Sequence, residues 1–106
     1  MTAYLLTFRT PPGPGGPSAF EAWAGWQLKL GARLRDRGNP VFTAVSLGAS
    51  AAGTSLGGYS LIRAVSLDEA VSLAQGCPML AAGGGVEVGE LTYHDDMFDE
   101  WLGRHA

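Results

Sequence analysis

The same helix-start signal occurs twice in this sequence, and each copy lies between two runs of residues that favour β-strands. The signal is a capping box, in which a Ser side chain accepts a hydrogen bond from the amide three residues later and the Glu there reaches back. The two copies are Ser18-Ala19-Phe20-Glu21 and Ser66-Leu67-Asp68-Glu69. Two successive strand–helix–strand units form the split β-α-β arrangement of a ferredoxin-like fold. We therefore expect an α+β chain with the order β-α-β-β-α-β.

Hydrophobic pattern and turn residues place the elements of this fold. Four runs rich in aliphatic and aromatic side chains, each bounded by turn residues, predict strands. They are residues 3–9, 41–47, 59–65 and 86–91. The first helix is expected from residue 18 to about residue 37, where Gly38 ends it, and the second from residue 67 until Gly76. The expected product is a sandwich of one four-stranded antiparallel sheet with two helices on one face.

The length of the chain, 106 residues, is the size of one domain, and 46% of the residues are hydrophobic. We expect a single domain over residues 1–106 with its core at 3–92. Residues 93–106 are expected to form a short C-terminal helix with Met97, Trp101 and Leu102 on its apolar side. Because so short a helix is marginal alone in water, it should dock on the sheet edge or on a partner subunit.

Three of the predicted strands carry neighbouring apolar residues, which place aliphatic or aromatic side chains on both faces of the sheet. The pairs are Leu5-Leu6, Val41-Phe42 and Leu61-Ile62. A strand with one wet face would alternate cleanly, and a monomer of this kind would expose a large apolar sheet surface. Two-fold pairing is the commonest way to cover such a surface. We expect a homodimer that packs sheet face against sheet face.

Charge and cysteine content exclude several classes of function. The formal net charge is -3, which gives no electrostatic attraction to nucleic acid or to an anionic membrane, and no apolar run approaches a membrane span. Cys77 is the single cysteine and cannot form an internal disulfide, which is typical of a cytoplasmic protein. The consecutive residues His94-Asp95-Asp96 are a poor metal site, because neighbours rarely converge on one ion. We expect no metal and no cofactor.

Asp36 and Asn39 are the first candidate site, at the end of the predicted first helix. The Asp36 carboxylate would act as a base or hydrogen-bond acceptor, and Asn39 would orient a ligand carbonyl. The alternative is that Asp36 is a solvated charge and Asn39 is a turn residue before Pro40.

Trp23, Trp26 and Gln27 are the second candidate site, on the apolar stripe of the first helix. Gln27 needs a hydrogen-bond partner there, and it would face a cavity lined by the two indoles that binds a small planar ligand. The alternative is ordinary core packing with Gln27 bonded to the backbone.

Five segments of this sequence, in their order and spacing, resemble the YCII-related family. They are residues 34–41 with the run Asp36-Arg37-Gly38-Asn39-Pro40, then 58–62, 66–70, 76–78 and 83–88. The resemblance implies a ferredoxin-like domain that dimerises through its sheets. Better-studied relatives, among them a dehydrochlorinating enzyme, pair a His on the first helix with a nearby Asp. Asp36 corresponds to such an acid, whereas the first predicted helix contains no His.

Two functions agree with these observations. The first is a protein that binds a small organic molecule in a cleft between the first helix and the sheet, with catalysis left open and Asp36 as the candidate catalytic residue. The second is a non-catalytic, regulatory or partner-binding homodimer. A deep pocket with Asp36 or Gln27 pointing inward would favour the first, and a cleft filled by Trp23 and Trp26 would favour the second.

Overall fold

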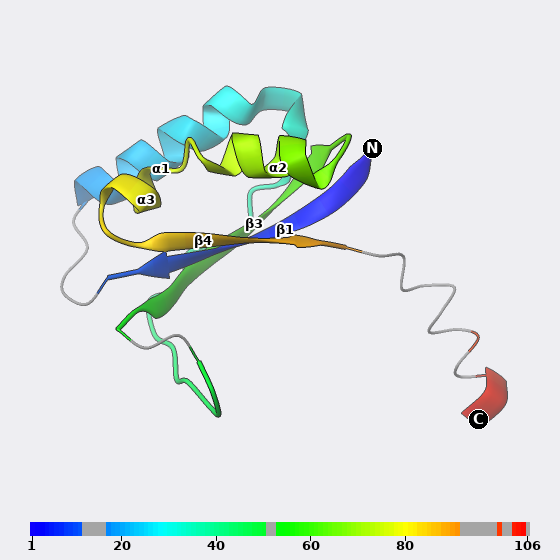
Figure 1. The fold of residues 1–106 in the computed structure, drawn as a ribbon. Helices are drawn as coiled ribbons and strands as arrows, with labels where there is room; N and C mark the ends of the chain where they lie inside the picture. Colours follow the sequence, from blue (N-terminus) through cyan, green and yellow to red (C-terminus); the bar gives the residue numbers. More distant parts are fainter. Residues whose placement is uncertain (12–16, 51–52, 92–99, 101–102, 106) are drawn as a thin grey trace.

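The computed structural model describes residues 1–11, 17–50, 53–91, 100 and 103–105. Its elements in chain order are β1 (Thr2–Thr10), α1 (Pro17–Leu30), the 3-10 turn η1 (Gly31–Arg33), β2 (Leu34–Asp36), β3 (Ser55–Ala64), α2 (Leu67–Ala74), α3 (Pro78–Ala81) and β4 (Gly85–Glu90). The strands form one antiparallel sheet in the order β2-β3-β1-β4. All three α-helices lie over the same face of this sheet (Figure 1). The predicted α+β, ferredoxin-like fold is confirmed.

The core lies between the helices and the sheet, and strand alternation builds it. Tyr4, Leu6 and Phe8 on β1 are buried, and so are Ser60, Ile62 and Ala64 on β3. Phe8 packs edge-to-face against two indoles of α1, with ring centroids 5.7 Å from Trp23 and 5.9 Å from Trp26. Such T-shaped aromatic pairs add to the free energy gained by burial alone.

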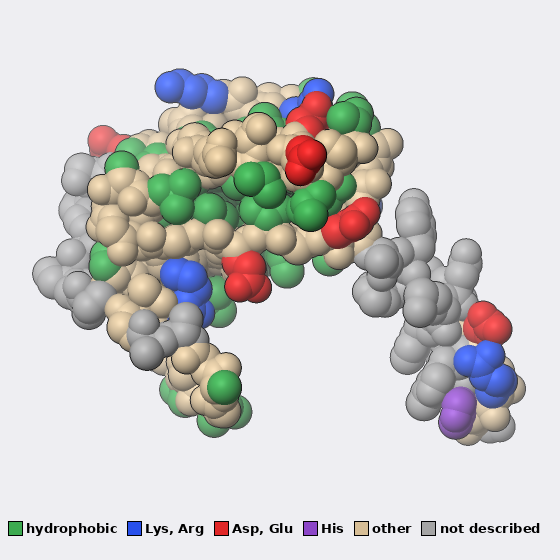
Figure 2. All heavy atoms as spheres, viewed as in Figure 1, with side chains coloured by type: hydrophobic (Ala, Val, Ile, Leu, Met, Phe, Trp, Pro, Cys, Tyr) green, Lys and Arg blue, Asp and Glu red, His purple; other side chains and the backbone are tan. Residues whose placement is uncertain are grey.

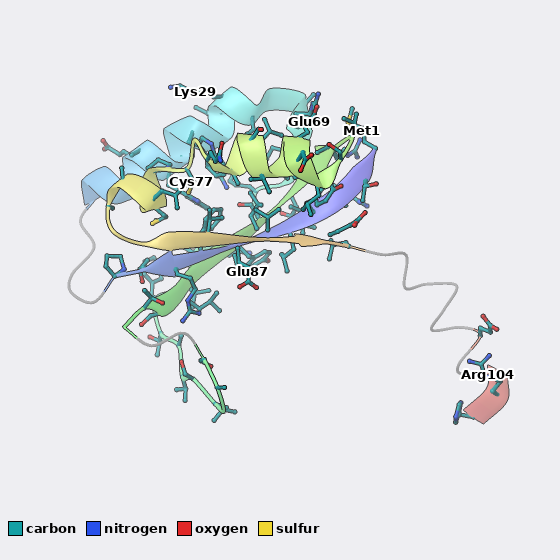
Figure 3. All side chains as sticks on the ribbon, viewed as in Figure 1. Met1, Lys29, Glu69, Cys77, Glu87 and Arg104 are labelled. Carbon is teal, nitrogen blue, oxygen red and sulfur yellow. The ribbon has the colours of Figure 1, made fainter. Side chains whose placement is uncertain are left out.

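The opposite side of the sheet, which we call the open face, carries Leu5, Thr7, Tyr59, Leu61 and Glu87. The first four are half-buried. Leu6 and Ile62, their neighbours on the helix side, are 0% exposed. Apolar residues therefore occupy both faces of β1 and β3, as the paired leucines and Leu61-Ile62 predict. Glu87 on β4 points away from the helices and marks the polar edge of the open face (Figure 3).

The second strand is not where the sequence predicts it. Residues 41–47 form no strand, and β2 is Leu34–Asp36, which lies within the range predicted for the first helix. The reason is Gly31, whose φ of 56° turns the chain out of α1 directly after Leu30. A left-handed residue after the last helical turn is a common helix end, and glycine adopts it without steric cost. Leu34 can then pair with Ile62 on β3.

The second helix begins as predicted. Ser66 is its N-cap, and the Ser66 side chain accepts a hydrogen bond of 3.1 Å from the Glu69 amide. The Glu69 carboxylate accepts from the Val65 amide at 3.2 Å and also pairs with Arg33 of η1. The Glu69 side chain therefore connects the start of α2 to η1, the turn that follows α1.

Several other predictions differ or fall outside the described parts. A short helix, α3, follows α2 because Pro78 suits a first helical position. The Ser18 side chain of the first capping box lies outside the description, and so do the apolar residues Met97, Trp101 and Leu102 of the predicted C-terminal helix. Residues 103–105 are helical. No helix in the described ranges has the length and apolar character needed to cross a membrane.

Candidate functional site

A pocket of about 210 Å³ lies between α1 and the β2 edge of the sheet. Its lining residues are Trp23, Ala24, Gln27, Leu28, Leu34 and Arg37. Four of them come from α1, one from β2 and one from the turn after β2. Leu28 is 80% exposed at the rim, whereas Trp23 and Gln27 are buried. Because Gly31 ends α1 early, the chain folds back and β2 forms the second wall.

Gln27 forms the polar floor of the pocket. Its Nε2 donates to the Arg37 carbonyl at 2.9 Å and to the Ser60 hydroxyl at 2.7 Å. The Ser60 hydroxyl donates in turn to the same carbonyl at 2.7 Å. Gln27 is 3% exposed and Ser60 is 0% exposed, so this triangle of bonds is shielded from water. It holds the turn after β2 against β3 and so fixes the backbone at Arg37.

Trp26 lies away from the pocket, although it is one helical turn from Trp23. Its Nε1 donates to the Leu73 carbonyl of α2 at 3.3 Å. The ring approaches Gly76 so closely that a Cβ there would lie 3.1 Å from Nε1. Trp26 therefore joins α1 to the end of α2, and the pocket contains one of the two indoles considered from the sequence.

Asp36 and Asn39 belong to a turn beside the open face. Asp36 Oδ1 accepts a hydrogen bond of 2.9 Å from the Gly38 amide, and Asn39 Nδ2 donates to the Tyr59 hydroxyl at 3.1 Å. Gly38 has φ 72°, and a Cβ there would lie 1.8 Å from the Tyr59 carbonyl oxygen, so only glycine fits. Both candidate side chains are exposed, and neither lines the pocket.

The two candidate sites are therefore on different sides of the sheet. A bulge separates Leu34, opposite Ile62, from Asp36, opposite Leu61. Since Ile62 faces the helices and Leu61 the open face, Trp23 and Gln27 lie on the helix side and Asp36 on the other. A ligand role for Asp36 and Asn39 stays a prediction, and their contacts agree with the turn chemistry considered as the alternative.

Arg37, Leu34 and Ser60 complete the pocket and its floor, and sequence analysis did not select them. Leu34 and Arg37 were assigned to a helix that ends sooner than predicted. Gly31 is the sequence feature that indicates the true end of the helix, because glycine commonly follows the last helical residue. The sequence gives a weaker indication for Ser60. It is two residues from Ile62 on β3, so both side chains point to the same, buried face of the strand.

Cys77 is buried between the helices and the sheet at the start of α3 (Figure 3). Burial raises the pKa of its thiol, so the group stays protonated near neutral pH, where a nucleophilic cysteine needs its thiolate. Cys77 packs as an apolar side chain. Within the described ranges there is no group of three or more His, Cys, Asp or Glu side chains placed to hold a metal ion. The run His94-Asp95-Asp96 lies outside those ranges.

No sequence model of a known family matches this chain, and no curated protein matches it. One solved structure with a similar fold is 5-chloro-2-hydroxyhydroquinone dehydrochlorinase from Burkholderia phenoliruptrix, in complex with 2,5-dihydroxybenzoquinone. The two chains are 22% identical, with a TM-score of 0.54, and the match covers 80% of this chain and 90% of that one. At this identity the likeness shows a shared fold, so the function has to be argued from the residues of this chain.

Proposed function

We propose that this protein is a cytoplasmic, YCII-related homodimer that binds a small, single-ring organic anion in the pocket between α1 and β2. The observation that carries the proposal is the composition of the pocket. Trp23, Leu28 and Leu34 provide apolar lining, and Arg37, an exposed cationic residue, is among the lining residues as well. Apolar walls with a few placed polar groups are typical of small-molecule sites.

The volume of the pocket suits a ligand with one ring. A cavity of about 150 Å³ is large enough to hold benzene, whereas drug-sized ligands need roughly 300–1,000 Å³. The pocket, at about 210 Å³, falls between these limits. The dehydrochlorinase of similar fold was also solved with a single-ring ligand, a quinone. An aromatic ring would lie against the Trp23 indole.

The charge of the ligand follows from Arg37. In the part of the chain that the structure describes, the ion pairs are Arg33–Glu69 and Arg104–Glu100, so Arg37 is not engaged in one. A guanidinium at the rim of an apolar pocket favours a carboxylate, which it can bind through two parallel hydrogen bonds. Gln27 bonds to the backbone carbonyl of Arg37, so this contact leaves the guanidinium available for a ligand.

Binding without catalysis agrees best with the described lining residues. Among them Arg37 is the one ionisable side chain, and they include no carboxylate, imidazole, thiol or amine for general acid–base work. The regulatory or partner-binding alternative requires no occupant in the pocket. The two proposals therefore differ in a measurable property, which is the affinity of the pocket for a small anion.

Benzoate and its neutral counterpart benzyl alcohol test this proposal. We expect benzoate, added to the ¹⁵N-labelled full chain, to shift the indole resonance of Trp23 and the side-chain amide resonances of Gln27. Benzyl alcohol should bind more weakly because it lacks the carboxylate. Arg37→Ala should raise the benzoate dissociation constant by roughly 10-fold, the worth of one charge-assisted contact.

Arg35→Ala is the matched control, since Arg35 is an exposed arginine two residues away that does not line the pocket. It should leave benzoate affinity unchanged. If Arg37→Ala and Arg35→Ala lost the same affinity for benzoate, the loss would reflect the lower positive charge of the protein and not a contact with Arg37. No response of Trp23 to millimolar benzoate would overturn the proposed function.

A further inference from the structure

The segment 41–50, which we call the arm, projects from the sheet on the side away from the helices (Figure 1). It holds three large apolar side chains that touch almost nothing in their own chain. Phe42 is 91% exposed, and Val45 and Leu47 are each 84% exposed. Figure 2 shows hydrophobic side chains gathered at the tip of this projection, well separated from those over the core.

The arm is anchored at both ends. At its start, Pro40 forms a bridge with Gly58, and the Val41 amide donates to the Gly57 carbonyl at 3.0 Å. Four residues after the arm, Arg9 on β1 donates from Nε to the Thr54 hydroxyl at 3.2 Å and from a terminal nitrogen to the Thr54 carbonyl at 3.0 Å. These bonds hold the arm next to the open face.

The sequence of the arm is unsuited to permanent exposure to water. From residue 38 to residue 62 the chain contains no Asp, Glu, Lys, Arg or His. Soluble chains normally interrupt exposed apolar stretches with charge, because uncovered ones associate without specificity. The arm has exposed apolar side chains and no charged residue, so we expect another surface to bury these side chains in the functional protein.

We propose that the arm packs on a second copy of this chain and completes the interface between two open faces. This inference rests on the homodimer of the proposed function. Four strands spaced about 4.8 Å apart give an open face of only about 400 Å² in projection, whereas a stable interface buries roughly 800 Å² of accessible surface per partner. Burying Phe42, Val45 and Leu47 adds on the order of 300–400 Å².

A second copy fits these features better than an unrelated partner. The arm lies on the side of the sheet away from the helices (Figure 1). By strand alternation, the paired residues Leu5 and Leu61 at the apolar centre of the open face lie on that side too, so one approaching body can cover both. Homodimer interfaces are the most apolar class of protein interface, in keeping with a charge-free arm. In a two-fold symmetric dimer, the arm of each copy packs on the other copy, so the apolar area buried by one arm is gained twice.

The triple variant Phe42→Ser, Val45→Ser, Leu47→Ser of the full chain tests the arm. We expect sedimentation equilibrium to show a dimer for the wild type and a dimer dissociation constant at least roughly 100-fold higher for the variant. Because these side chains are exposed within the protomer, its circular dichroism spectrum should stay the same. Val65→Ser is the control, since Val65 is 67% exposed but lies in the turn before α2; its dissociation constant should not change.

A photoreactive benzophenone side chain at position 42 identifies what covers the arm. In a mixture of light and heavy isotope-labelled chains, illumination should produce covalent dimers that join a light and a heavy copy. A wild-type dimer that the triple variant leaves intact, with cross-links only inside one chain, would overturn the arm inference and leave the dimer standing. A wild-type monomer would overturn both, while benzoate binding would be judged separately by its own titration.

Discussion

Gln27 shows how a single buried side chain can serve both the fold and the pocket. Through Nε2 it connects α1 to the turn after β2 and to Ser60 of β3. Its partners are themselves bonded to each other, so the arrangement is a closed triangle. A buried polar network that is fully satisfied rigidifies its surroundings, and one that loses a member leaves the others desolvated. The rigidity of the pocket rim at Arg37 therefore depends on Gln27.

Replacing Gln27 by Leu should lower the free energy of unfolding by about 1–3 kcal/mol. The apolar side chain fills similar space, but Ser60 and the Arg37 carbonyl each lose a buried donor. Urea denaturation measures this change. Gln75→Leu is the control, because Gln75 is exposed at the end of α2 and should tolerate the same substitution within about 0.5 kcal/mol. Equal stability of the two variants would show that the triangle contributes nothing to folding.

At the scale of elements, the end of α1 decides where the second strand forms. Gly31 leaves the helix at φ 56°, and three residues later the chain is already paired with β3. Gly25, inside α1, has ordinary helical geometry. A Cβ would meet no atom within 4 Å at either glycine, so the two sites differ in backbone conformation and not in packing.

Alanine at these two positions should therefore have opposite effects. Gly25→Ala should stabilise the protein by about 0.5–1 kcal/mol, because alanine is the better helix former. Gly31→Ala should destabilise it by about 1–2 kcal/mol, the cost of a left-handed conformation in a residue with a Cβ. Thermal and urea denaturation of the pair measure both effects. A neutral or stabilising Gly31→Ala would contradict the role given to this residue.

The same elements show what the sequence can and cannot predict. The order of strands and helices is local information, since capping boxes and hydrophobic periods are encoded within a few residues, and the fold class follows from it. The position of β2 is not local, because a strand of three residues is selected by pairing with β3 and not by its own composition. Helical spacing identified Trp23 and Gln27, but which of two neighbouring indoles lines a pocket depends on the packing of α2.

At the scale of the whole molecule, substitutions at Leu61 and Ile62 test assembly and folding separately. Ile62 faces the helices and is fully buried, whereas Leu61 lies on the open face. Ile62→Asp should unfold the protomer, because it buries an unpaired charge. Leu61→Asp should give a folded monomer. Sedimentation and circular dichroism of both variants check this, and a Leu61→Asp protein that remains a dimer would exclude the open face as the interface.

If the pocket between α1 and β2 binds a single-ring anion, as we propose, a crystal structure of the full chain grown with benzoate should show the anion in place. We expect one benzoate in each protomer, with the ring against the Trp23 indole and the carboxylate within hydrogen-bond distance of the Arg37 guanidinium. The Gln27 triangle should be unchanged beneath it. A pocket closed by Leu28, or benzoate bound only elsewhere on the molecule, would contradict the claim.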